Sequence, residues 1–149
     1  MLTMEKTSSK AADGNSRVHW PAEMQKDFTE NEFNGCVGSV LVSETDRVRV
    51  WHLTIPPGKR CNFHRHVLNY FWSALVAGQA RNFYEDGTER DFDYYRGETR
   101  HLDFAKGEYM VHAVENLGKT DLLFTTVEFL DSPNAPLPIP EAMRLKAPS

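Results

Sequence analysis

The chain is dominated by short runs of β-branched and aromatic residues that are separated by turn signals. The clearest run, residues 47–55 (RVRVWHLTI), stops at Pro56-Pro57-Gly58. Such composition is typical of strands, and a Pro-Gly sequence ends them. The Asp86-Gly87 pair predicts a tight hairpin. Further runs of this kind lie at residues 68–77, 80–84, 88–95, 100–104, 108–114 and 121–130.

No amphipathic segment longer than two helical turns accompanies these runs, and only residues 21–30 compete for a helix. Seven or so short strands separated by turns predict an all-β sandwich or barrel. A chain of 149 residues is of the size of one domain. We expect a disordered, polar N-terminal tail at residues 1–17, one barrel domain at 18–131 and a Pro-rich arm at 132–149. The arm could lie over a neighbouring subunit or be unstructured.

Charge and composition exclude several classes of protein. Lys and Arg number 17 against 21 Asp and Glu, which gives a net charge of −4 with no basic stripe, so nucleic acid is not an expected partner. No apolar run approaches the roughly 20 residues that cross a bilayer. The absence of a secretory signal and the presence of only two cysteines favour the cytoplasm. Exposed edge strands lead us to expect a homodimer.

Three of the six histidines form a pattern typical of a metal site. His64 and His66 are two residues apart, so a strand would direct both imidazoles to the same face. His112 belongs to a later predicted strand that could pair across a barrel. Three neutral imidazoles suit Zn, Fe, Ni or Cu(II) and leave coordination positions open for water or substrate. The pattern predicts a divalent metal site.

The residues around these histidines resemble the two signatures of the cupin superfamily. Gly58, five residues, His64-x-His66 and a strand that ends at Gly78 match the first signature, and His112 followed after three residues by Asn116 matches the second. The resemblance implies a double-stranded β-helix, or jelly-roll, barrel with a divalent metal ion on the three histidines. The run from Glu98 to Asn116 is also similar to small RmlC-like cupins named for β-alanine degradation.

The chain departs from these signatures at the fourth ligand. Counted along the first signature, the expected glutamate is Phe71, which leaves a site of three histidines. Without a carboxylate, the full dipositive charge stays on the ion and makes it a stronger Lewis acid. Cupins with three histidines include small Fe(II) dioxygenases, so the resemblance implies dioxygenase-like chemistry and favours Fe(II) over Mn, Zn or Ni. Asn69 or Tyr70 could supply a fourth oxygen, although hydrogen bonding for Asn69 and packing for Tyr70 are the simpler explanations.

Alternation along the predicted strands outlines a pocket for a small-molecule ligand. Inward-facing residues share the parity of His112, of the first signature, or of the apolar set in each flanking strand. The last strand offers a choice between an even-numbered set that ends at Glu128 and a more apolar odd-numbered set, and we favour the apolar one. The expected lining is Trp51, Leu53, Asn69, Phe71, Ser73, Met110, Val114, Val127 and Phe129.

Two functions remain open at this point. The first is a small-molecule metalloenzyme with dioxygenase-like or Lewis-acid chemistry on an oxygen-bearing substrate. The second is a cupin that binds or senses a small molecule without catalysis, because one scaffold can host many functions. The sequence identifies no general base beside the histidines, so it assigns no catalytic residue.

Overall fold

The computed structural model describes residues 14–148. Residues 1–13 of the predicted tail lie outside the described residues. Gly14–Arg17, which the sequence analysis assigns to that tail, form a short 3-10 helix, η1. The Arg17 guanidinium donates to the backbone oxygen of Glu85 at 2.7 Å and lies 4.1 Å from the centroid of the Phe28 ring. These contacts explain why residues 14–17 pack against the domain although their composition is polar.

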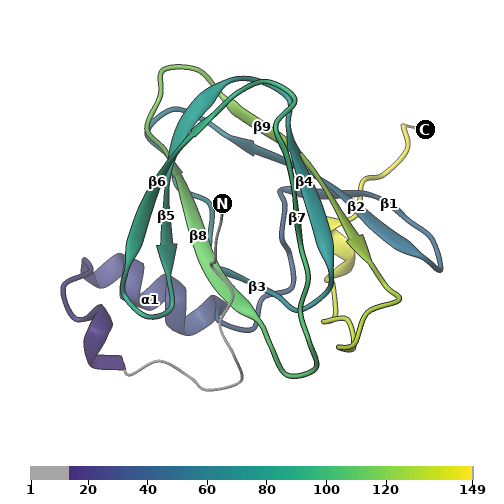
Figure 1. The fold of residues 1–149 in the computed structure, drawn as a ribbon, viewed down its shortest axis with the longest axis horizontal. Helices are drawn as coiled ribbons and strands as arrows, with labels where there is room; N and C mark the ends of the chain where they lie inside the picture. The colour runs from purple at the N-terminus through teal and green to yellow at the C-terminus, as the bar shows by residue number, and fades with distance from the viewer. Residues whose placement is uncertain (1–13, 149) are drawn as a thin grey trace.

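Within residues 14–148, nine strands form two antiparallel sheets that face each other (Figure 1). The five-stranded sheet has the order β1 (Val40–Glu44), β2 (Val48–Ile55), β9 (Leu122–Phe129), β4 (Tyr70–Ala74) and β7 (Thr99–Leu102). The four-stranded sheet has the order β3 (His64–His66), β8 (Met110–Asn116), β5 (Gly78–Tyr84) and β6 (Glu89–Tyr94). This architecture confirms the predicted double-stranded β-helix.

The outer face of the four-stranded sheet is covered by helix α1 (Ala22–Asn31), which begins after Pro21 (Figure 1). Met24 and Phe28 of this helix pack with Trp20 and Phe63 and with the outward residues of β8. The Trp20 and Phe63 rings stack at 5.1 Å between centroids. Within residues 14–148, no helix is long and apolar enough to cross a membrane.

The C-terminal arm lies on its own barrel. The Leu145 amide donates to the Leu41 oxygen at 2.9 Å, and Arg144 forms an ion pair with Glu44 of β1. Ile139 and Met143 pack against the buried cluster of Val37, Leu41 and Trp51. A short 3-10 helix, η2 (Glu141–Met143), occupies the middle of this contact. The structure therefore shows the arm as part of the domain rather than as a free tail.

Candidate functional site

The three predicted ligands meet on the inner wall of the four-stranded sheet. His64 and His112 are direct partners across the β3–β8 pair, and His66 is one pleat further along β3. The ring centroids are 4.6–5.1 Å apart, and one nitrogen from each ring lies within 4.8 Å of the others. The antiparallel register places i and i+2 of one strand beside the partner residue of the other, so three imidazoles converge from two short strands.

Burial keeps these imidazoles neutral. His64 and His66 are each 3% exposed, and desolvation lowers the pKa of His64 from its ordinary value of 6.5 to about 4. Burial also lowers the pKa of His66 and of His112 well below 6.5; His64 and His112 lower the pKa of His66 further, and His64 lowers that of His112 further. A neutral imidazole is the form that binds a metal ion, so the site offers its lone pairs even in mild acid.

Hydrogen bonds set the orientation of two of the rings. The Nδ1 atom of His64 is 3.0 Å from the Asn62 backbone oxygen, and the Nδ1 atom of His112 is 2.9 Å from the Asn82 Oδ1. Each Nδ1–H donates to its oxygen, which leaves Nε2 with a free lone pair. Such contacts to a carbonyl oxygen are typical of histidines that bind metal.

His66 is oriented by stacking instead. The Tyr70 ring lies against it with 4.1 Å between centroids and 11° between planes, while its Nδ1 has no hydrogen-bond partner among the described residues. Its Nε2 is 3.2 Å from the Nε2 of His112. With metal–nitrogen distances of about 2.0–2.1 Å, two adjacent ligands of one ion lie about 3 Å apart. The residues present therefore fit a divalent ion.

Tyr70, rather than Phe71, occupies the inward position after the histidine pair. β4 pairs with β9 so that Tyr70 opposes Glu128 and Trp72 opposes Thr126, all on the inner face. Phe71 lies on the outer face, where its ring contacts His101 and Phe129. Counting three residues after His66 instead of four gives the correct parity. The aromatic ring of Tyr70 thus stands where the resemblance implies a carboxylate.

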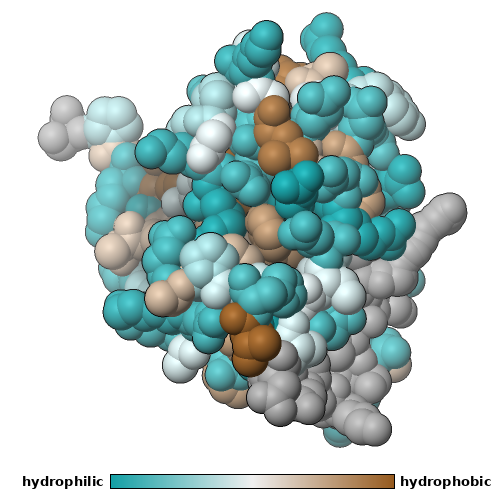
Figure 2. All heavy atoms as spheres, turned by 90° about the vertical axis from the view of Figure 1, so that its left-hand side faces the viewer, coloured by the Kyte–Doolittle hydropathy of each residue, from teal (hydrophilic) through white to brown (hydrophobic). Residues whose placement is uncertain are grey.

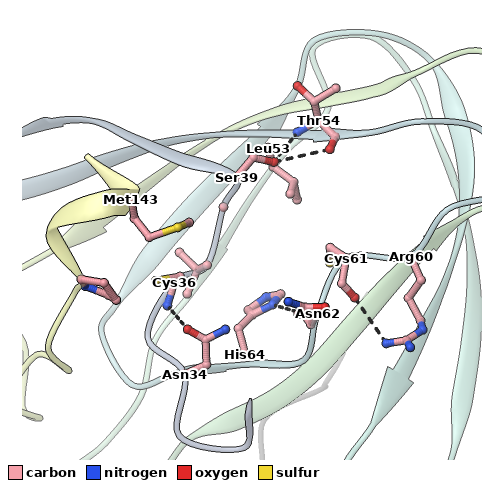
Figure 3. A pocket seen from close by; sticks show the side chains of 13 residues that line it. Asn34, Cys36, Ser39, Leu53, Thr54, Arg60, Cys61, Asn62, His64 and Met143 are labelled. Carbon is pink, nitrogen blue, oxygen red and sulfur yellow. Dashed lines mark hydrogen bonds between the residues drawn. The ribbon is translucent and has the colours of Figure 1, made fainter. Parts of the chain in front are cut away.

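Two cavities with lining residues in common lie beside the histidines. The inner cavity measures about 60 Å³ and is lined by all three histidines and by the aromatic side chains of Tyr70, Trp72, Tyr94 and Phe124. The outer cavity measures about 450 Å³ and is lined in part by Asn34, Ser39, Thr54, Arg60 and Asn62. Val37, Leu53 and His64 line both cavities. In Figure 3, His64 and Leu53 lie on facing sides of the outer cavity, and Met143 of the C-terminal arm lies to one side.

The charge around these cavities favours an anionic or neutral ligand. Among the described residues, no aspartate or glutamate lines either cavity. Arg60 is the charged side chain in the outer wall, and it is paired with Asp27 of α1. A bound divalent ion would therefore bring positive charge to a wall that offers no carboxylate to compete with an anionic ligand.

The predicted pocket residues are placed differently from one another. Leu53 lines both cavities, and Val114 lines the inner one. Trp51 and Met110 face inward but are packed in the core, where the Trp51 Nε1 donates to Glu128 Oε1 at 2.8 Å. The Asn69 Oδ1 accepts from the Phe104 amide at 2.7 Å, away from the histidines.

Four predicted pocket residues lie on the outer face of the five-stranded sheet, which corrects our parity for β4 and β9. These residues are Phe71, Ser73, Val127 and Phe129, and Val127 opposes Phe71 and Val50 in the register. The inward set of β9 is Leu122, Phe124, Thr126 and Glu128. The sequence analysis favours the more apolar, odd-numbered set, and that prediction is wrong. The polar members of the other set can be buried because they have partners, as Glu128 has in Trp51.

The sequence analysis does not identify several of the residues that line the cavities. Asn82 and Tyr94 lie on the two strands that the Asp86-Gly87 hairpin joins, and the sequence analysis assigns no pocket residue to either strand. Cys36 and Val37 belong to the irregular segment between α1 and β1, and Met143 to the arm. Neither stretch has a periodicity from which its contacts could be inferred.

The asparagine of the second signature has a structural role here. Asn116 is 1% exposed, and its Nδ2 donates to the backbone oxygens of Ile55 and Thr120 at 2.8 Å each. Its Oδ1 accepts from the Gly118 amide at 2.7 Å. These bonds hold together the turns at the end of the barrel, so the residue stabilises the scaffold rather than the site.

Comparisons with known proteins agree with this architecture. No family model matches the chain. Over 77 residues the chain is 34% identical to the oxalate decarboxylase OxdC of Bacillus subtilis (strain 168), a match that covers 50% of this chain and 19% of that protein. The chain thus corresponds to about a fifth of the length of this curated relative.

Solved structures extend the comparison. A cupin domain from Bordetella pertussis Tohama I aligns over 58% of this chain and 85% of its own, with 24% identity and a TM-score of 0.52. A B. subtilis oxalate decarboxylase structure, from work on its Mn(II) centres, aligns over 55% of this chain and 21% of its own, with 29% identity and a TM-score of 0.43. That last score is too low to support an argument about fold. With the topology described above, the alignment with the B. pertussis cupin domain shows that this chain has the double-stranded β-helix fold.

Proposed function

We propose that this protein is a metal-dependent enzyme that binds one divalent ion on His64, His66 and His112 and acts on a small, oxygen-bearing substrate. The observation that carries the proposal is the convergence of three neutral imidazoles, two buried and that of His112 half-buried, in the wall of a cavity. Two of these rings keep Nε2 free because their Nδ1–H groups donate to oxygens. An ion bound there supplies a Lewis acid and open coordination positions.

The chain's own residues define what such a site can do. Val37 and Leu53 give both cavities an apolar wall close to the histidines. Within the described residues no carboxylate lines the cavities, so a carboxylate general base is absent from these walls. This composition supports redox or Lewis-acid chemistry over proton abstraction by a neighbouring acid residue.

Two reaction classes follow from the resemblance and the comparisons. The cupin resemblance favours Fe(II) and dioxygenase-like chemistry on β-dicarbonyl compounds. The partial match to an oxalate decarboxylase, a protein studied for its Mn(II) centres, supports Mn(II) and a small carboxylate substrate. Both classes require the same three ligands and differ in ion and substrate.

Metal analysis of protein purified without a polyhistidine tag tests the site. We expect about one equivalent of Fe or Mn per chain, and we expect the double variant His64→Ala/His112→Ala to lose it. His101→Ala is the matched control, because His101 lies on the outer face of the five-stranded sheet. Retention of the ion by the double variant would show that the ligands are assigned wrongly.

Activity assays then separate the reaction classes. Oxygen consumption with Fe(II) and a panel of β-dicarbonyl compounds tests the dioxygenase class, and CO₂ release from oxalate with Mn(II) tests the decarboxylase class. A non-catalytic binding or sensing cupin is the second candidate, because an aromatic ring, Tyr70, replaces the expected carboxylate ligand beside His66. Full metal loading with no turnover of either panel would favour that candidate.

The remaining expectations stay predictions. They are a small-molecule ligand, a homodimer, a cytoplasmic location and a relation to cupins named for β-alanine degradation. Light scattering on the purified protein measures the oligomeric state directly. A monomeric mass at micromolar concentration would contradict the homodimer.

A further inference from the structure

We propose that the Asn82 side-chain amide binds an oxygen atom of the ligand at the metal site, which makes Asn82 both a support for His112 and a determinant of ligand class. This inference rests on the proposed function, because it places the ligand in the inner cavity. It adds the donor that selects a carboxylate or carbonyl oxygen.

Asn82 is built into the wall of the site. It lies on β5, directly opposite Val114 of β8, and it is 4% exposed. Its side chain lines the inner cavity together with all three histidines. Its Oδ1 is 2.9 Å from the Nδ1 of His112. The Oδ1 atom of Asn82 is thus held by His112, and the rest of its side-chain amide lines the cavity.

The contact with His112 determines which atom of the amide remains available. His112 can offer Nε2 to an ion only when Nδ1 carries the proton, and that proton needs an acceptor. The Oδ1 of Asn82 is that acceptor, so the Nδ2 group is the free end. Among the described residues, Nδ2 has no hydrogen-bond partner. A buried donor without a partner in a cavity wall indicates a hydrogen bond that a ligand completes.

The chemistry of a free NH₂ group selects the ligand. It can only donate, so its partner must be an acceptor oxygen or nitrogen. No aspartate or glutamate lines the cavity among the described residues, so no negative charge repels an anion there. The inner cavity, about 60 Å³, has room for a small head group, and the outer cavity of about 450 Å³ shares Val37, Leu53 and His64 with it. A small carboxylate, held at once by the ion and by Nδ2, fits these constraints.

The two roles of Asn82 are separable by substitution. Asn82→Asp keeps the acceptor for His112 and removes the donor, whereas Asn82→Ala removes both without adding charge. Asn69→Asp is the matched control, because the Asn69 Oδ1 accepts from the Phe104 amide and its side chain lines neither cavity. Circular dichroism melts of each variant establish that it is folded.

The experiment measures Zn²⁺ affinity and then, at saturating Zn²⁺, oxalate affinity by calorimetry. Neither measurement requires turnover. We expect Zn²⁺ affinity within threefold of wild type for Asn82→Asp and at least tenfold weaker for Asn82→Ala. We expect oxalate binding to weaken at least tenfold in both variants, and to stay within twofold in Asn69→Asp.

Each other outcome overturns a defined part. Oxalate binding within twofold of wild type in Asn82→Ala would exclude Nδ2 as a ligand donor. A tenfold loss of Zn²⁺ in Asn82→Asp would exclude the supporting role through Oδ1. If the Zn²⁺-loaded wild type does not bind oxalate, the proposed ligand class is wrong, whereas the metal site is confirmed. A wild type that takes up no divalent ion would overturn the proposed function itself, and this inference with it.

Discussion

The outer faces of the two sheets of the barrel differ in whether a helix covers them. The four-stranded sheet turns its outer side chains toward α1, where Phe63, Tyr109 and Val111 are buried. The side of the molecule that carries this helix is mostly hydrophilic, with isolated hydrophobic residues (Figure 2). The five-stranded sheet leaves Phe71, Val127 and Phe129 half-buried or exposed on its outer face. Both outer faces are therefore apolar: α1 covers that of the four-stranded sheet, and that of the five-stranded sheet is accessible. For this reason, an apolar set of residues does not identify the inner face of either sheet.

The inner faces differ as well. The four-stranded sheet contributes the three histidines, whereas the five-stranded sheet contributes a buried carboxyl group, Glu128, bonded to Trp51. Burial raises the pKa of Glu128 to about 7, although the Trp51 hydrogen bond and the Arg49 charge lower it. One inner face is suited to bind an ion, and the other stabilises the scaffold.

The largest effect that sharpens this comparison is expected at Trp51. Trp51→Ala removes a side chain with 0% exposure and leaves Glu128 without its donor, so we expect a loss of about 3–5 kcal/mol in the free energy of unfolding. Phe71→Ala on the outer face of the same sheet is the control, with an expected loss of about 1 kcal/mol. Urea denaturation measures both. Equal losses would show that the two faces of this sheet do not differ in packing.

The next effect concerns the pH dependence that Glu128 imposes. Its folded pKa of about 7 lies above the ordinary value of 4.5, so the folded chain holds this proton more tightly. The resulting stabilisation is complete below about pH 4.5 and is lost as the pH rises through 7, with an upper bound of about 3 kcal/mol. Glu128→Gln should flatten this part of the stability profile. A slope between pH 5 and 7 that survives in the variant would assign it to another group.

On the opposite sheet, the histidines predict a pH dependence of the other sign. The pKa of His64 is lowered from 6.5 to about 4, so the protonated form is favoured in the unfolded chain. The metal-free protein should lose stability as the pH falls from 6.5 through 4. Zn²⁺ affinity should fall less than tenfold between pH 7 and pH 5.5, measured by competition with a chromogenic chelator. A steeper loss would indicate that the rings are accessible to protons.

The smallest effect is expected at Phe129, which is 37% exposed at the end of β9. Phe129→Ser should change the free energy of unfolding by less than about 1 kcal/mol and leave Zn²⁺ affinity unchanged. Thermal melting and metal titration check the two values. A change in metal affinity would show that the outer face of the five-stranded sheet is coupled to the histidines.

The histidine site could be predicted because it depends on spacing within two short motifs. The spacing of His64 and His66 predicts that both lie on one face of a strand, and the spacing of His112 and Asn116 matches the second signature. The five-stranded sheet could not be assigned in this way, because a shift of one residue in β4 exchanges Tyr70 for Phe71. In β9 the apolar criterion selected the wrong face, since Glu128 is buried with a partner that lies 77 positions away in the chain. Contacts of this length are not visible in local composition.

The cavity walls show the same limit. Pro140 and Met143 line the outer cavity only because the arm folds back onto β1 through Arg144 and Leu145. The arm therefore links a stretch of chain outside the barrel to the entrance of the site. Substitutions there can alter the size and shape of the molecules admitted while the coordination chemistry on β3 and β8 stays the same, so selectivity and reactivity can diverge independently in relatives of this chain.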